Sequence, residues 1–117
     1  MQNNNTPKSF QISARQGDVY LVRIPDDVKL DNISQVEKDQ GRTILAYGEV
    51  TGHAHAIVSD QAALWAEAGN IANRILEVSK TVFLKHEEHD PIEILPGRYE
   101  IVRQREYHPE AIRYVAD

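Results

Sequence analysis

Two closely spaced histidines lie in the stretch Gly48-Glu49-Val50-Thr51-Gly52-His53-Ala54-His55-Ala56-Ile57. His53 and His55 are two residues apart in a run of strand-forming composition, and alternate side chains of a strand point to the same face. Both imidazoles are therefore predicted to face one spot. Ala54 and Ala56 are predicted on the opposite face, where their small side chains let a neighbouring element pack closely.

The residues before and after this pair extend the pattern. Thr51-Gly52 interrupts the run just before His53, and a glycine within a strand pattern is typical of a bulge or a close backbone approach. A second pair, His86 and His89, follows in the segment 85–91. A spacing of three places two side chains on opposite faces of a regular strand, so both reach one site only if the chain turns after His86. Glu87-Glu88 and Asp90-Pro91 favour such a turn.

The composition is that of one small globular domain. The chain has 117 residues, of which 41% are hydrophobic and 26% charged, so we expect a single domain over residues 16–117 after a flexible, Gln/Asn-rich arm over residues 1–15. It has no cysteine, which excludes disulfides and thiolate ligands. No apolar run is long enough to span a membrane and no secretory signal is recognisable, so a cytoplasmic protein without membrane contact is expected. The net charge of -5 argues against a broad nucleic-acid-binding surface.

The distribution of turn residues predicts an all-β fold, either a small antiparallel β-barrel or a sandwich, with room for one short helix. Residues 28–41 are predicted as a loop with at most one turn of helix, and residues 62–68 are compatible with a helix or a strand. Pro96-Gly97 predicts a type II turn. The strands are expected at residues 19–24, 42–50, 53–57, 74–78, 81–86, 90–95, 98–107 and 111–115.

The leading functional hypothesis is a hydrolase with a histidine-centred metal site. Imidazoles suit a divalent transition metal such as Zn, Mn, Fe or Ni, and a catalytic metal keeps one position open for water or substrate. Glu49 and Glu88 are candidate bases for bound water, and Arg103 or Arg105 would bind a small anionic substrate, with phosphoesters as the expected class. The predicted metal ligands are His53, His55, His86 and His89.

Two other functions remain open at this point. The strand that carries Arg103, Arg105, Glu106 and Tyr107 could form, with the histidines, a metal-independent site that cleaves RNA or nucleotide phosphodiesters, although alternating charges on a strand also form ordinary cross-strand pairs. A non-catalytic β-module that binds a ligand or a protein is the third hypothesis. In each case a homodimer is expected, because small β-domains often assemble through exposed strands.

Four blocks resemble those of a family of small bacterial proteins with no established function. They are Gln-Gly-Asp-Val, Gly-Glu-Val-Thr-Gly-His-Ala-His, His-Glu-Glu-His-Asp-Pro-Ile and Arg-Gln-Arg-Glu-Tyr, and the resemblance covers residues 16–109. It implies no mechanism. A looser similarity links His53 and His55 to the metal-binding His-x-His of the cupins, which are small β-barrels. The cupin pattern is then incomplete, since Glu67 is the first glutamate after His55 and Pro96-Gly97 follows the later histidines instead of preceding them.

Overall fold

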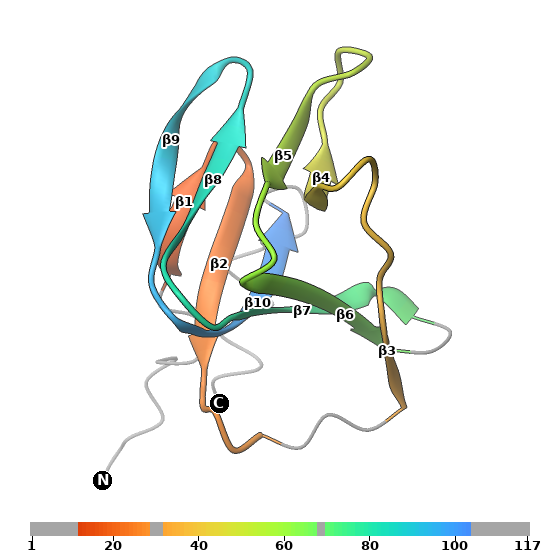
Figure 1. Ribbon diagram of the computed structural model, residues 1–117, viewed down its shortest axis with the longest axis vertical. Helices are drawn as coiled ribbons and strands as arrows, with labels where there is room; N and C mark the ends of the chain where they lie inside the picture. Colours follow the sequence, from red (N-terminus) through yellow and green to blue (C-terminus); the bar gives the residue numbers. More distant parts are fainter. Residues whose placement is uncertain (1–11, 29–31, 68–69, 104–117) are drawn as a thin grey trace, which may run out of the picture.

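A computed structural model describes residues 12–28, 32–67 and 70–103, with the backbone alone of residues 70–73 (Figure 1). The described residues form strands and turns and contain no helix. The strands are β1 (Ile12–Gln16), β2 (Val19–Ile24), β3 (Ile33–Gln35), β4 (Thr43–Tyr47), β5 (Ala54–Ile57), β6 (Ala62–Glu67), β7 (Asn70–Val78), β8 (Val82–His86), β9 (His89–Ile94) and β10 (Gly97–Arg103).

The strands form two antiparallel sheets. One sheet has the order β1-β2-β10-β7-β6-β3, and the other has the order β4-β5-β8-β9. Neither sheet closes on itself, so of the two predicted architectures the sandwich is the one that fits (Figure 1). β5 lies inside the smaller sheet, between β4 and β8, whereas β9 lies at its edge and contacts β1 of the other sheet.

Both sheets contribute one face to a common core. The larger sheet supplies apolar side chains from β2, β6, β7 and β10, and the smaller sheet supplies them from β4, β5, β8 and β9. This is the arrangement expected when two sheets pack face to face. The largest fully buried side chains of this core are Leu21, Leu45, Ile57, Leu64, Leu76, Leu84 and Ile94.

The strand predicted at residues 19–24 is confirmed, the segment left open between helix and strand is settled, and one strand and two boundaries were predicted wrongly. Residues 19–24 form β2 as predicted, and the segment that begins at Ala62 is a strand. β3 lies within residues 28–41, which were predicted as a loop, because Ile33–Gln35 pairs with β6. Ile12–Gln16 forms β1, so the predicted arm of residues 1–15 is too long. Strand character begins earlier than residue 74, since β7 starts at Asn70.

Side-chain alternation holds in β10 and fails in β4. In β10, Tyr99 and Ile101 are buried as one face of the strand. In β4, the consecutive residues Leu45 and Ala46 both belong to the main core, whereas Ile44 is buried in a separate cluster, and the pairing with β5 shifts register between Ile44 and Ala46. A bulge of this kind places consecutive side chains on the same face, so strict alternation does not hold through β4. The predicted strand at residues 111–115 and the second half of the one at 98–107 lie outside the described residues.

Ala54 and Ala56 occupy the position predicted for them. They form a small buried cluster with Ile44, apart from the main core. His55 lies between them in β5 and is 3% exposed. The strand therefore directs its alanines to one face and its histidine to the other, which is how β5 contributes to the site.

The described part of the chain also contains no helix long and apolar enough to cross a membrane.

Candidate metal centre

His53 and His55 are positioned by the tight connection between β4 and β5. Gly52 has a φ of +88°, the N–H of His53 donates to the carbonyl of Val50 at 3.0 Å, and the N–H of Gly48 donates to the carbonyl of His53 at 2.9 Å. The predicted interruption at Thr51-Gly52 is therefore a turn. It reverses the chain so that His53 stands just before β5 and His55 stands within it, and both side chains line one pocket.

His86 and His89 are brought together by the β8–β9 hairpin. His86 ends β8, Glu87 and Glu88 form the turn, and His89 begins β9 opposite His86. The turn that the sequence required after His86 is present. Asp90-Pro91 is not part of it, because both residues belong to β9. The two imidazole centroids lie 4.8 Å apart.

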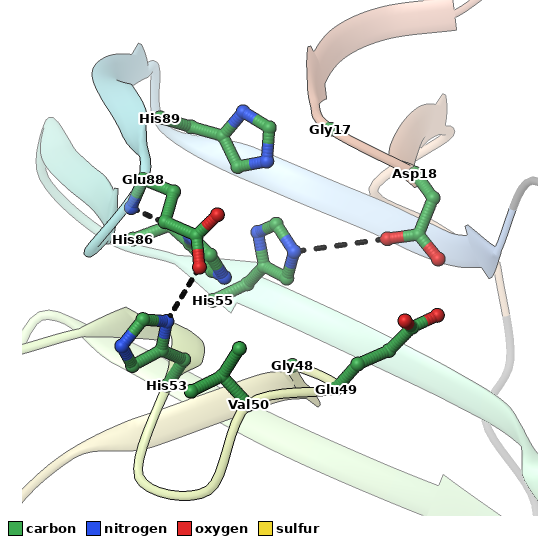
Figure 2. A pocket seen from close by; sticks show the side chains of 10 residues that line it. All are labelled: Gly17, Asp18, Gly48, Glu49, Val50, His53, His55, His86, Glu88 and His89. Atoms are coloured by element: carbon green, nitrogen blue, oxygen red, sulfur yellow. Dashed lines mark hydrogen bonds and ion pairs between the residues drawn. The ribbon is translucent and has the colours of Figure 1, made fainter.

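The four imidazoles form one cluster around a pocket of about 390 Å³. Ring centroids are 4.3 Å apart for His55 and His86, and 5.8 Å apart both for His53 and His86 and for His55 and His89. Figure 2 shows His55 in the middle of the site, with His89 and His53 on either side. The pocket is lined by Gly17, Asp18, Gly48, Glu49, Val50, His53, His55, His86, Glu88 and His89.

The protonation of His55 is set by Gln16, the last residue of β1. The side-chain amide nitrogen of Gln16 donates to the carbonyls of Leu84 at 2.8 Å and Asp90 at 2.9 Å. Two carbonyl partners fix the orientation of the amide, so its oxygen, 2.8 Å from Nδ1 of His55, must accept a hydrogen bond from that nitrogen. The neutral ring therefore carries its proton on Nδ1, and Nε2 is left with a lone pair.

Burial keeps this ring neutral. Desolvation lowers the pKa of His55 to about 4, with smaller contributions from the neighbouring charges of His86, His89 and Arg103, while Asp18 acts in the opposite direction. At neutral pH, His55 is then an uncharged imidazole with a free nitrogen. A metal ion requires a ligand in this state.

The turn between the two hairpin histidines contacts His86 and His53. The backbone N–H of Glu88 donates to Nδ1 of His86 at 3.0 Å, so the proton of neutral His86 is on Nε2. One carboxylate oxygen of Glu88 lies 2.9 Å from Nδ1 of His53, at ion-pair distance but without the alignment of a hydrogen bond. Figure 2 shows both contacts.

Glu87 also approaches this part of the site. Its carboxylate accepts the backbone N–H of Ala54 at 3.0 Å, and this hydrogen bond lowers the pKa of Glu87. One donor atom from each of His53, His86 and Glu87 lies within 4.8 Å of the others. These three residues are therefore close enough for small movements to place them around a single ion.

Asp18 forms the wall opposite His53. One of its oxygens accepts hydrogen bonds from Nε and Nη2 of Arg103 at 3.1 and 2.8 Å, and the other lies 3.7 Å from Nε2 of His55. Burial raises the pKa of Asp18, but the hydrogen bonds and charge of Arg103 outweigh this effect, and the pKa lies below its ordinary value. Asp18 is therefore an ionised carboxylate at the edge of the histidine cluster.

Two glycines make room for the imidazoles. A Cβ atom on Gly17, whose φ is +58°, would lie 2.8 Å from Nε2 of His89 and 3.3 Å from Cε1 of His55. A Cβ atom on Gly48 would lie 3.1 Å from Cβ of His53 and 3.2 Å from Nε2 of His86. A side chain at Gly17 would therefore force His89 to move, and one at Gly48 would require its neighbours to shift by a few tenths of an ångström.

The structure brings together all four histidines predicted as metal ligands, with Glu49 and Glu88 beside them. Arg103 reaches the site through its hydrogen bonds to Asp18. Arg105, Glu106 and Tyr107, which the metal-free hypothesis requires, lie outside the described residues. Sequence reasoning missed Gln16 and Asp18. Both residues belong to the Gln-Gly-Asp-Val block, whose resemblance implies no role for them, and the sole further signal was two polar side chains flanking a glycine next to a buried strand.

The comparisons with known proteins identify a family. No curated protein and no solved structure matches the chain, and the similarity to the cupins stays an expectation. One family model matches residues 15–104, a range that includes every described residue of the site from Gln16 to Arg103. The chain belongs to the family described as Domain of unknown function (DUF8820).

Proposed function

We propose that the histidine pocket binds a divalent transition metal ion and hydrolyses a small anionic ester, with phosphoesters as the leading substrate class. The observation that carries the proposal is the convergence of four imidazoles from two separate hairpins on one pocket. His55 is buried and His53 and His86 are partly buried, and a ring removed from water needs a partner for its polar nitrogens, so this cluster is costly to build without a ligand.

The spacing of the rings agrees with metal coordination. Two imidazoles that bind a tetrahedral metal through nitrogens at about 2.0 Å have ring centroids about 5 Å apart. The separations among His55, His86 and His89 are 4.3, 4.8 and 5.8 Å, and they straddle this value. With nitrogen and oxygen donors and no thiolate in the chain, Zn, Mn, Fe and Ni are the ions that this donor set favours.

The carboxylates of the pocket suit proton transfer. A bound divalent metal lowers the pKa of a coordinated water toward neutrality, which supplies a nucleophile. Glu88 or Glu49 accepts the proton of that water. The water oxygen then forms the new bond to phosphorus, the bond from phosphorus to the leaving oxygen breaks, and the carboxylic acid returns its proton to the leaving oxygen.

The charge of the pocket favours a metal-dependent mechanism for an anionic substrate. Asp18, Glu49 and Glu88 all line it, and only Asp18 has a described arginine partner among the pocket contacts, namely Arg103. An anion would be repelled by these walls unless a metal ion supplied positive charge at the histidines. The volume of about 390 Å³ is in the range of small-molecule sites, so the proposed substrate is small.

The first experiment is elemental analysis of untagged protein by inductively coupled plasma mass spectrometry. We expect close to one transition metal per chain, and loss of this metal in a His53→Gln/His55→Gln double variant. Asp26→Asn is the control, since Asp26 is exposed and pairs with Arg23 away from the pocket. Protein that neither contains a metal nor takes up added Zn, Mn, Fe or Ni would contradict the proposal.

The second experiment tests the chemistry with p-nitrophenyl phosphate and bis(p-nitrophenyl) phosphate. Protein stripped with EDTA should be inactive, and one of the four metals should restore hydrolysis in the wild type and in Asp26→Asn but not in the double variant. Cleavage of RNA or a cyclic nucleotide at full rate in EDTA would instead support the metal-independent mechanism and refute this one.

A further inference from the structure

The turn between β1 and β2 gives three consecutive residues three different contacts with the histidine cluster. The side-chain oxygen of Gln16 accepts a hydrogen bond from Nδ1 of His55, Gly17 leaves room for the rings of His89 and His55, and Asp18 faces Nε2 of His55. β1 and β2 belong to the larger sheet, whereas all four histidines come from the hairpins of the smaller one. The turn therefore closes the site from the opposite layer of the sandwich.

The contact between His55 and Asp18 is not an ordinary ion pair. In an ordinary pair the histidine donates its Nε2 proton to the carboxylate at hydrogen-bond distance. Here the proton is held on Nδ1 by Gln16, and the Nε2 lone pair faces a carboxylate oxygen 3.7 Å away. Two acceptors without a proton between them repel each other, and this arrangement becomes favourable when a cation lies between them.

The distance suits such a cation. Two ligand atoms that bind a tetrahedral metal at about 2.0 to 2.1 Å lie about 3.4 Å from each other. The observed 3.7 Å between Nε2 of His55 and Oδ1 of Asp18 is within a few tenths of an ångström of this value. The second oxygen of Asp18 is held by Nε and Nη2 of Arg103, so its first oxygen is kept facing the histidine.

We propose that Nε2 of His55 and Oδ1 of Asp18 are paired ligands of one divalent metal ion, and that Gln16 is a positioning residue that keeps His55 in the tautomer able to coordinate. The inference rests on the proposed metal site and goes beyond it, because it adds a carboxylate ligand from the other sheet and assigns a role to Gln16. Partners that fix the second nitrogen of a coordinating histidine raise metal affinity in other proteins by about 10- to 100-fold.

The role of Gln16 is tested without any metal. Long-range ¹H–¹⁵N correlation spectra of ¹⁵N-histidine-labelled protein in EDTA at neutral pH report which nitrogen of each imidazole carries the proton. We expect the proton of His55 on Nδ1 in the wild type, and a shift toward Nε2 in Gln16→Met, which removes the acceptor. Gln61→Met is the matched control, since the Gln61 amide bonds Asp60 and Ser79 outside the pocket. A wild-type His55 protonated on Nε2 would overturn the assignment.

The role of Asp18 is tested with Zn²⁺ and Co²⁺. Asp18→Asn should lower Zn²⁺ affinity by at least about 10- to 100-fold, the loss typical when an outer-shell partner of a metal ligand is replaced. It should also change the visible absorption of the Co²⁺ form at saturation. Asp26→Asn is the matched control, because Asp26 is also an aspartate paired with an arginine. Unchanged affinity and an unchanged spectrum would exclude Asp18 as a ligand.

The outcomes separate this inference from the proposed function. If His55→Gln abolishes Zn²⁺ binding while Asp18→Asn behaves as wild type, the metal site stands and the ligand pair is wrong. If the wild type binds no metal, both fail. Should Asp18→Asn not fold, the ¹³C shift of the Asp18 carboxylate in wild-type protein gives the answer, since it must change when one equivalent of Zn²⁺ is added.

Discussion

The two pairs of histidines are built into the molecule in different ways. His55 lies on β5, inside its sheet, is 3% exposed, and has one nitrogen bound to Gln16. His89 begins the edge strand β9 at a hairpin turn and is exposed. Both rings face the same pocket. One half of the site is thus fixed by the core of the sandwich, and the other half is carried by the end of a hairpin.

The hydrogen bonds show the same contrast. His55 has its Nε2 lone pair directed into the pocket, whereas neutral His86 has its proton on Nε2 because Nδ1 accepts the N–H of Glu88. A metal at Nε2 of His86 would require that backbone hydrogen bond to break, at a cost of about 1 kcal/mol. His55 is prepared for coordination, and the hairpin must adjust. We therefore expect the affinity of the site for a metal ion to depend more on His55 than on the histidines of the β8–β9 hairpin.

The largest expected effect is on metal affinity. His55→Gln should weaken Zn²⁺ binding about a thousandfold, or roughly 4 kcal/mol, because it removes a fixed ligand whose supporting partners alone are worth up to about a hundredfold. His89→Gln should cost about tenfold, since neighbouring groups of the hairpin can move toward the ion. Competition titration with a chromophoric chelator measures both. Equal losses of Zn²⁺ affinity in His55→Gln and His89→Gln would contradict the distinction between a fixed His55 and an adjustable hairpin.

The next effect is a pH dependence of stability in metal-free protein. The pKa of His55 is about 4 in the folded protein and about 6.5 in the unfolded chain, so between these values only the unfolded chain binds the proton. Stability should therefore be complete above pH 6.5 and fall by about 3 kcal/mol as the pH is lowered to 4. Urea unfolding in EDTA at several pH values measures this, and His55→Gln should lose most of the slope.

The smallest effect concerns the glycine between the two halves. Gly17→Ala and Gly41→Ala both force alanine into a left-handed backbone, since φ is +58° and +80°, and each should cost about 1 to 2 kcal/mol in the free energy of unfolding. A Cβ on Gly41 meets nothing within 4 Å, whereas one on Gly17 meets His89 and His55. Only Gly17→Ala should therefore also weaken Zn²⁺ binding, by about tenfold. Equal Zn²⁺ affinities of the two variants would show that the His89 and His55 rings accommodate a Cβ at position 17 without losing metal affinity.

The parts of the site that depend on neighbouring residues could be predicted from the sequence. The two-residue spacing of His53 and His55 and the acidic turn between His86 and His89 are short-range patterns, and each sets the geometry of its own hairpin. The alternation that buries Tyr99 and Ile101 in β10 is a pattern of the same kind. Such features depend on backbone periodicity alone, so they could be predicted.

The other half depends on contacts between distant segments. Gln16 meets His55 across 39 positions of sequence, and Arg103 meets Asp18 across 85. No periodicity links these residues, because their approach follows from the way one sheet lies over the other. The bulge in β4 escaped prediction for a related reason, since it is set by the pairing of Ile44 and Ala46 with β5. Tertiary pairing overrides a local pattern in both cases.

The place of β1 at the end of its sheet has a consequence for exchange kinetics. Edge strands separate from a sheet more readily than interior ones, because only one side is hydrogen-bonded. When β1 opens, Gln16 releases His55 together with the carbonyls of Leu84 and Asp90, and the His55 ring can then move its proton to the other nitrogen. The lifetime of a bound ion would then be set by how often this outer strand detaches, rather than by the width of the pocket mouth.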